Sequence, residues 1–130
     1  MIEPVWVRDD IVLAIHQRQL AEHGGGVGVR DTGLLESALN KPKNLFHYND
    51  PKPSIAAMAA SYAYGIACNH PFVDGNKRTA YIVCQLFLNL NNYVLTAPSA
   101  DKYQTFIELA SGKMSEANLS IWISENVTSK

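Results

Sequence analysis

One polar stretch, His70 to Ala80 (HPFVDGNKRTA), constrains the fold more than any other part of the chain. An alanine-rich segment precedes it, and the most apolar segment, Tyr81 to Leu90, follows directly. Pro71 disfavours a helical conformation at the residue before it, and Gly75 allows a tight reversal. The stretch therefore predicts one helix that ends just before Pro71, a polar loop, and a second helix that begins after Gly75 and is buried.

The residue types in this loop suit the binding of phosphate. At the start of the second helix, the free backbone N–H groups of Gly75, Asn76 and Lys77 point outward at the positive end of the helix dipole. Such an end is an anion site. Lys77 and Arg78 add positive charge, and a guanidinium can bind two phosphate oxygens at once. Because cations in a first turn oppose the dipole at a cost of about 0.3–1 kcal/mol, their placement favours a bound anion.

Asp74 and His70 add a metal ligand and a base. A bare phosphate would repel Asp74, so we expect Mg²⁺ to lie between the two. An imidazole titrates near neutral pH, so His70 can accept a hydroxyl proton. Phe72 is expected to anchor the loop in the core. Each feature alone is common in structural loops, but a base, a metal ligand and an anion site together indicate transfer from a nucleotide to a hydroxyl.

At this point the residues resemble a known family. The pattern His-x-Phe-x-Asp-Gly-Asn-Lys-Arg looks like the signature of the Fic/Doc proteins, and Lys77 with the following Thr-Ala is similar to the Doc (death-on-curing) branch. The likeness extends through Gly24–Leu39 (GGGVGVRDTGLLESAL). It implies a compact all-helical domain that uses ATP and Mg²⁺. The implied roles are general base for His70, Mg²⁺ ligand for Asp74, and phosphate binding for Gly75, Asn76 and Arg78.

Two departures bear on which group is transferred. Adenylylating Fic proteins have Gly where this chain has Lys77, and a second Arg where it has Tyr81. In Doc, as the resemblance implies, the lysine obstructs the usual nucleotide placement, ATP binds reversed, and the γ-phosphoryl group is transferred to a threonine of elongation factor Tu. Doc relatives can, however, have Ala at Gly75 and can lack Pro71, so the loop is locally closer to Fic.

We therefore expect a Doc-like toxin kinase that blocks translation, with His70, Asp74, Lys77 and Arg78 as catalytic residues. The alternatives are a Fic-type protein adenylyltransferase and a non-catalytic helical module that binds a phosphate or a peptide.

The resemblance also implies a restraining partner. Fic-type proteins can be silenced by an inhibitory Glu with Ser or Thr four residues earlier and Gly or Asn just after it. Glu125 has Ile121 at the earlier position, and Glu36, four residues after Thr32, is followed by Ser37. Because neither segment matches, a Phd-like antitoxin is expected, whose disordered tail folds into a helix-lined groove on binding.

Composition excludes several other classes. The 130 residues, 47% of them hydrophobic, are expected to form a single domain, residues 1–130. The net charge of −1 argues against non-specific binding to nucleic acid or to a membrane surface. Cys68 and Cys84 are too few for a disulfide framework, and no segment reaches the roughly 18 apolar residues of a membrane span. A soluble, unprocessed cytoplasmic protein is expected.

Capping residues and apolar spacing predict six helices and little strand. Besides the two helices around the polar loop, helices are expected from Asp9 or Asp10 to Glu22, over Thr32–Leu39, from Ser99 to Ala110, and after Ser115. In the first of these, Ile11, Ile15 and Leu20 are expected on the buried side. The run Gly24–Gly26 should end that helix.

Two further expectations concern segments beside the polar loop. Asn40–Pro53 contains three prolines and should be an irregular surface loop. By resemblance its Leu-Phe-His-Tyr segment, residues 45–48, forms a flap that pairs with an extended target; the alternative is an ordinary loop with Phe46 in the core. His16 is expected at the surface or its boundary, without a role.

Overall fold

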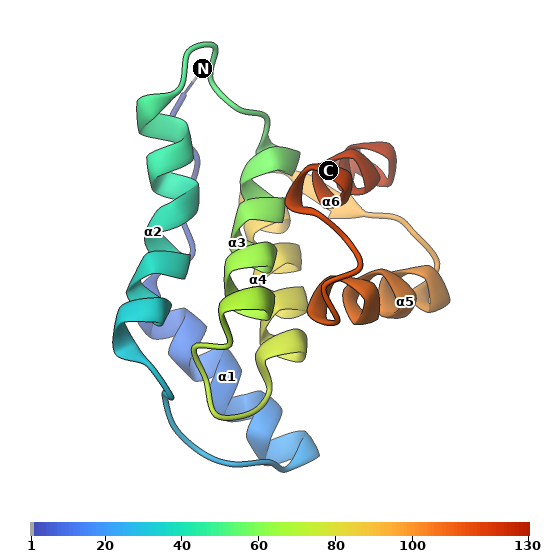
Figure 1. Cartoon of the computed structure of the whole chain (residues 1–130). Coiled ribbons are helices and arrows are strands. Elements are labelled where there is room, and N and C mark those ends of the chain that lie inside the picture. Colours follow the sequence, from blue (N-terminus) through green and yellow to red (C-terminus); the bar gives the residue numbers. More distant parts are fainter. Residues whose placement is uncertain (1) are drawn as a thin grey trace.

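A computed structural model describes residues 2–130, so Met1, the first residue of the N-terminal segment expected to be extended, lies outside the described residues. The described chain forms six helices and two short strands (Figure 1), which confirms the predicted all-α fold. The helices are α1 (Asp9–His23), α2 (Thr32–Tyr48), α3 (Ile55–Asn69), α4 (Asn76–Leu90), α5 (Ser99–Ala110) and α6 (Glu116–Glu125). The strands β1 (Tyr93–Leu95) and β2 (Val127–Ser129) pair antiparallel, with Val94 opposite Thr128.

The pair α3 and α4 forms the centre of the molecule. Helix α3 packs against α4, α2 and α6, and its Met58, Tyr62 and Ile66 are fully buried. The small side chains of α3 allow α2 to approach it closely. A Cβ on Gly65 would lie 3.1 Å from the Cα atom of Ala38 in α2, so only glycine fits there without a shift.

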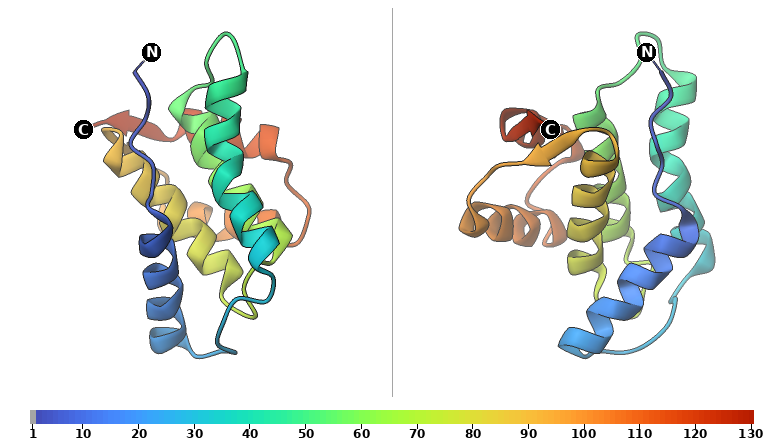
Figure 2. Two further views of the ribbon diagram at one scale, coloured as in Figure 1. Left: turned by 90° about the vertical axis from the view of Figure 1, so that its left-hand side faces the viewer. Right: turned by 180° about the vertical axis from the view of Figure 1, so that it is seen from behind.

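The loop between α3 and α4 lies at one end of this central pair. Helix α1 crosses α4 near that end and α5 packs on α4 from another side, whereas the two strands lie at the opposite end (Figure 2). The predicted end of one helix just before Pro71 is confirmed, since α3 ends at Asn69. Ser54, Asp31 and Ser115 cap α3, α2 and α6 through their side-chain oxygens. No helix of residues 2–130 is both long and apolar enough to span a bilayer.

The prediction of an irregular loop over Asn40–Pro53 is wrong for most of these residues. Helix α2 continues to Tyr48 with Pro42 inside it, and only the residues after Tyr48 connect it to α3. A proline inside a helix costs about 3 kcal/mol because it removes one backbone hydrogen bond and crowds the preceding turn. Here the buried Leu39, Pro42 and Phe46 pack the extended helix onto the core, and this burial outweighs the local cost.

The segment expected as a β-pairing flap is the last turn of α2. Phe46 is only 6% exposed, as the alternative expected, but it lies in a helix and not in the ordinary loop which that alternative described. The Lys52 ammonium donates to the carbonyl of Phe46 at 2.8 Å and so satisfies one of the free carbonyls at this helix end. The expected flap is therefore wrong, because residues 45–48 are helical and offer no extended strand to a target.

Helix α1 buries a different face from the one expected. Its N-cap is Arg8, without a side-chain hydrogen bond, and Asp9 is already its first residue. Val12 and His16 are the buried residues, while Ile11 is exposed. The four-residue spacing of Val12 and His16 aligns them on one side of the helix, and that side faces α4 and the loop before it.

Candidate active site

The loop from His70 to Gly75, called the motif loop below, is closed by its own side chains. His70 ends α3 in a left-handed conformation (φ 49°, ψ 56°), and Gly75 precedes α4 with φ 81°. The side-chain amide of Asn76 accepts from the N–H of Phe72 and donates to its C=O, both at 3.0 Å. Phe72 is fully buried, which confirms its predicted anchoring role. The side-chain amide of Asn76 is therefore used within the loop, and its backbone N–H stays unpaired among residues 2–130.

A second segment, Gly24 to Arg30, runs along the motif loop and is called the glycine strap below. The N–H of Val73 donates to the C=O of Gly28 at 3.1 Å, and the N–H of Gly26 donates to Oδ2 of Asp74 at 2.6 Å. A Cβ on Gly26 would lie 2.7 Å from Cγ1 of Val73, so a side chain there would push the two segments apart. The glycine run therefore does more than end α1: it allows close contact with Asp74.

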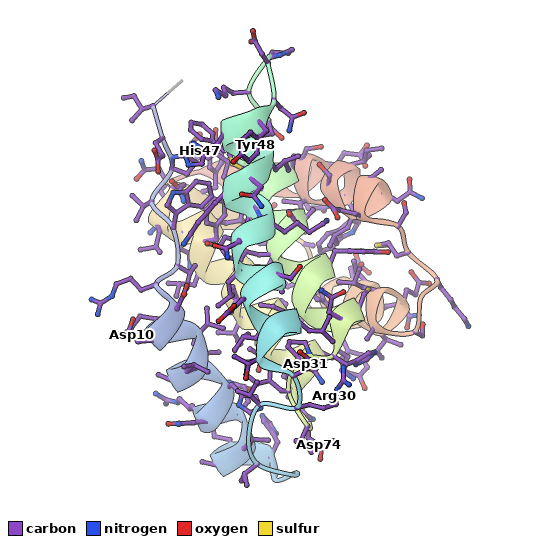
Figure 3. All side chains as sticks on the ribbon, turned by 60° about the vertical axis from the view of Figure 1, so that its left-hand side comes forward. Asp10, Arg30, Asp31, His47, Tyr48 and Asp74 are labelled. Carbon is purple, nitrogen blue, oxygen red and sulfur yellow. The ribbon has the colours of Figure 1, made fainter. Side chains whose placement is uncertain are left out.

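Arg30, at the end of the glycine strap, holds the end of α3. Its Nε donates to the carbonyl of His70 at 2.7 Å and its Nη2 to the carbonyl of Asn69 at 2.9 Å. Its backbone N–H also donates to the carbonyl of Pro71 at 2.7 Å. A cation bonded to the last carbonyls of a helix is stabilising, since those groups carry the negative end of the dipole. Arg30 thereby fixes the backbone at His70, and it lies at the same end of the molecule as Asp74 (Figure 3).

His16 is the largest departure from what was expected of the sequence. It is 3% exposed, its ring stacks on Phe72 with centroids 3.7 Å apart, and its Nε2 lies 2.8 Å from the backbone oxygen of Asp74. Because a carbonyl only accepts, Nε2 carries the hydrogen and donates it. The prediction of a surface histidine without a role is therefore wrong.

The backbone N–H groups at the start of α4, where an anion site is predicted, are unpaired within the described part of the chain. Among residues 2–130, no hydrogen-bond acceptor faces the backbone N–H groups of Gly75, Asn76, Lys77 or Arg78. The first turn contains no acidic residue that would compete with a bound anion. Four donors at the positive end of a helix, next to two cationic side chains, can bind a phosphate group.

Asp74 fits the role of a Mg²⁺ ligand by its donor chemistry. One carboxylate oxygen, Oδ2, accepts from Gly26, while Oδ1 has no hydrogen-bond partner among residues 2–130. The described residues contain no cluster of three His, Cys, Asp or Glu side chains that could hold a metal ion. Mg²⁺ is commonly bound by one or two carboxylates together with substrate phosphates and water, and one exposed carboxylate beside a phosphate site matches that pattern.

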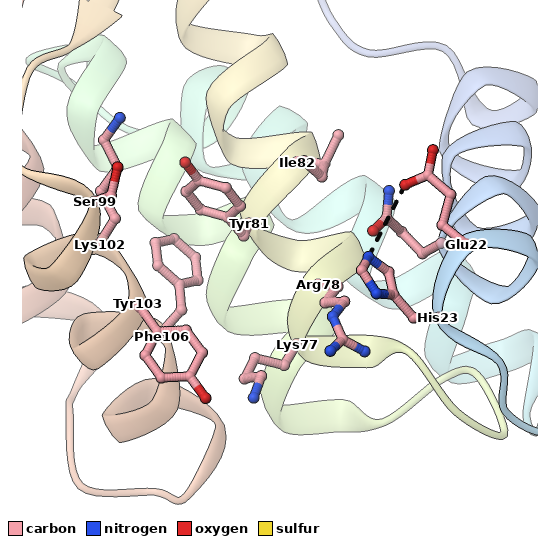
Figure 4. A pocket seen from close by; sticks show the side chains of 11 residues that line it. Glu22, His23, Lys77, Arg78, Tyr81, Ile82, Ser99, Lys102, Tyr103 and Phe106 are labelled. Carbon is pink, nitrogen blue, oxygen red and sulfur yellow. Dashed lines mark ion pairs between the residues drawn. The ribbon is translucent and has the colours of Figure 1, made fainter.

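A cavity of about 550 Å³ lies beside the motif loop, between α1, α4 and α5 (Figure 4). Lys77 and Arg78 line it, whereas His70, Asp74, Gly75 and Asn76 do not. The Nζ of Lys77 lies 5.5 Å from the ring centroid of Tyr103 on α5, a cation–π contact across the cavity. Tyr81 and Phe106, with ring centroids 5.1 Å apart, form an aromatic wall. The structure thus places the two cations between the motif loop and a partly apolar hollow.

Sequence reasoning found the residues that carry charge but missed those that hold the loop. Gly26, Arg30 and His16 come from α1 and the glycine strap, more than 35 positions before the motif loop in the chain. The resemblance through Gly24–Leu39 included two of them without assigning a role. A signal for His16 was present in the sequence: it lies four residues after Val12, on the face that α1 buries.

Comparison with known proteins adds three findings. The model of the Fic/DOC family matches residues 6–88, from the end of the N-terminal segment through most of α4. "Toxin Doc" of Mycolicibacterium smegmatis is 40% identical over 74 residues, which span 57% of this chain and 57% of that protein. "Protein kinase doc" of Escherichia phage P1 is 27% identical over 108 residues, which span 83% of this chain and 84% of that protein. Since the family match covers well over half of the 130 residues, the chain belongs to the Fic/DOC family.

Proposed function

We propose that this protein is a Doc-like toxin kinase, which transfers the γ-phosphoryl group of ATP to a Ser or Thr hydroxyl of a protein, with elongation factor Tu as the first target to test. The observation that carries the proposal is the row of unpaired N–H groups at Gly75–Arg78, directly after the Asp74 carboxylate. The names of the two relatives, a toxin and a protein kinase, support it.

Each part of the site has a role in this reaction. The N–H groups of α4 and the guanidinium of Arg78 would bind the phosphoryl oxygens and stabilise their charge, which is the largest protein contribution in phosphoryl transfer. His70, whose side chain is exposed, would accept the proton of the target hydroxyl. Asp74 would hold Mg²⁺, which neutralises phosphate charge when bound.

Two residues favour phosphoryl over adenylyl transfer. Lys77 extends across the cavity toward Tyr103, into space next to the phosphate site. Tyr81, where adenylylating relatives are expected to have a second arginine, is half-buried against Phe106 and supplies no cation.

A separate antitoxin is proposed as the restraint, because neither internal candidate matches the inhibitory pattern and one of them, Glu125, also lies far from the site. Glu125 ends α6 beside Asn126, whose carbonyl accepts from the N–H of Thr96 beyond the C-terminal end of α4. The motif loop is at the other end of α4, and a helix of 15 residues is about 22 Å long. Glu125 therefore does not occupy the phosphate site in this structure.

The test is incubation of the purified protein with Mg·ATP and elongation factor Tu, and separately with a cytosolic extract, followed by intact-mass measurement. A phosphoryl addition is expected, and an adenylyl addition would replace the proposal by the nucleotidyl-transfer alternative. His70→Ala should abolish transfer with an unchanged circular dichroism spectrum. No modified protein in either mixture would leave the binding-module alternative.

Toxicity is tested by expression. The wild-type chain alone should arrest bacterial growth, and co-expression with the small open reading frame beside its gene should relieve the arrest. Growth unaffected by the wild-type chain, at a level where folded protein is detected, would contradict the toxin assignment.

A further inference from the structure

We infer that His16 is a positioning residue of the candidate active site: it fixes the backbone of Asp74, and through it the carboxylate proposed to hold Mg²⁺. The inference rests on the proposed function for its catalytic consequence. Its structural part, that α1 controls the position of the motif loop through one buried histidine, stands on contacts alone.

The first observation is the number of independent contacts that His16 makes with the motif loop. Its ring stacks on Phe72 at an interplanar angle of 10°, and its Nε2–H donates to the backbone oxygen of Asp74 at 2.8 Å. A Cβ on Gly75 would lie 3.6 Å from Cδ2 of the same ring, so Gly75 also packs against it. One side chain from α1 thus contacts three residues of the motif loop.

The second observation is the burial of this polar ring. His16 and Val12 are the two buried residues of α1, and an apolar side chain at position 16 would fill the same space without a polar group to satisfy. A buried donor costs free energy unless it is paired. Here the pairing partner is the one carbonyl whose residue also carries the proposed metal ligand.

The third observation is that the backbone oxygen and the carboxylate of Asp74 both accept hydrogen bonds from the segment formed by α1 and the glycine strap. The N–H of Gly26 donates to the carboxylate at 2.6 Å, and His16 donates to the backbone oxygen. Both donors belong to α1 and the glycine strap, so the position of Asp74 depends on α1 rather than on α3 and α4, which flank the loop. A displacement of about 1 Å at a reacting group can lower a rate by about 100-fold.

The experiment compares two substitutions that separate ring stacking from hydrogen bonding. His16→Phe keeps an aromatic ring against Phe72 but removes the donor to Asp74. His16→Gln removes the ring but carries an amide N–H at a similar distance from the backbone. The matched control is His47→Phe, the same chemical change at an exposed histidine near the opposite end of the molecule (Figure 3).

Three readouts are needed, and the first does not depend on catalysis. Hydrogen exchange of the peptide covering residues 70–78 should become at least 10-fold faster in His16→Phe, with α3 and α4 otherwise unchanged, and should stay near the wild-type rate in His16→Gln. In the transfer assay, His16→Phe should lower kcat at least 10-fold with little change in the KM for the protein target. His16→Gln should recover most of this loss, and His47→Phe should behave as the wild type.

The outcomes separate the inference from the proposed function. Unchanged exchange of the motif loop in His16→Phe would overturn the positioning role, whatever the protein's activity. Faster exchange in a chain whose wild type transfers nothing would support the positioning role and contradict the proposed function. If His16→Phe does not fold, His16→Asn, whose amide is one methylene shorter, replaces it in the comparison with His16→Gln. Equal exchange in those two variants would overturn the inference.

Discussion

Replacing Arg30 by alanine tests whether the glycine strap sets the geometry of His70, the proposed general base. The guanidinium donates to the carbonyls of Asn69 and His70, at 2.9 and 2.7 Å, which are the last acceptors of α3. A hydrogen bond from a charged group contributes about 1.5–3 kcal/mol, but these carbonyls lie near the surface and water can replace the donor. We therefore expect Arg30→Ala to lower the free energy of unfolding by about 1–2 kcal/mol in total.

The same change should lower transfer even under conditions where the protein stays folded. His70 is a non-glycine residue with φ 49°, a conformation that costs about 1 kcal/mol or more and is kept only by surrounding contacts. Without Arg30, the loss of those contacts should let His70 relax and reduce kcat at least 10-fold, measured at a temperature where the variant is fully folded. Arg30→Lys offers a point charge instead of a planar group with two aligned donors, so its kcat should lie between those of the wild type and Arg30→Ala.

Urea unfolding gives the measurement, with Arg18→Ala as the matched control. Arg18 forms an exposed pair with Glu22 at 3.0 Å, one helical turn away, and such pairs contribute about 0.3–0.5 kcal/mol. At a urea m-value of about 1–3 kcal/mol/M, Arg30→Ala should shift the midpoint by roughly 1 M and Arg18→Ala by a few tenths. Equal shifts in the two variants, with normal transfer by Arg30→Ala, would refute the capping argument.

Three further predictions follow from other contacts. Gly26→Ala should lower the free energy of unfolding by about 1–3 kcal/mol and also lower transfer, because its Cβ would meet Val73 at 2.7 Å. Gly24→Ala has open space around its Cβ but φ 75°, so it should lower the free energy of unfolding by about 1 kcal/mol and leave transfer intact. Thermal unfolding and the transfer assay distinguish the two variants. Lys77→Gly should weaken phosphoryl transfer at least 10-fold, and phosphoryl transfer unaffected by it in the intact-mass assay would remove the reason for preferring the Doc branch. Burial raises the pKa of Cys84 to about 12. As pH rises from about 8.5 toward 12, the unfolded chain therefore loses the thiol proton first and the free energy of unfolding falls. Urea unfolding at pH 7.5 and 9.5 should show a smaller fall in Cys84→Ala than in the wild type, and an identical fall would contradict the raised pKa of Cys84.

The helices around the polar loop could be predicted because local rules decide them. Pro71 and Gly75 set the end of α3 and the start of α4, and the sequence gives both without any knowledge of tertiary contacts. The charges of Lys77 and Arg78 in a first turn likewise led to the prediction of an anion site from local sequence alone. Both inferences need only residues that are neighbours in the chain, and the helix boundaries are confirmed.

Predictions failed where distant contacts outweigh local preference. Pro42 and the prolines after it predicted a loop, but burial of Leu39 and Phe46 keeps α2 helical to Tyr48. His16 was assigned to the surface because a lone polar residue usually lies there, yet its partner Asp74 is 58 positions away in the chain. The short β2 strand was missed for the same reason, since its pairing with β1 brings the end of the chain back to the end of α4.

The pattern of hydrogen bonds along the motif loop gives an independent reason to place a ligand at the start of α4. Most backbone groups of the loop are paired with α1, the glycine strap or the side chain of Asn76: the carbonyls of His70, Pro71, Phe72 and Asp74, and the N–H groups of Phe72 and Val73. The carbonyl of Val73 and the N–H of Asp74 have no partner among residues 2–130. The next four N–H groups, Gly75 to Arg78, have no acceptor among residues 2–130. Proteins pair nearly all backbone polar groups that are withheld from water. Here the partners come from three places: α1, the glycine strap and the side chain of Asn76 in α4. A loop held this firmly around a row of unpaired donors is suited to binding an anion in one fixed position, which is what transfer of a phosphoryl group to a hydroxyl requires.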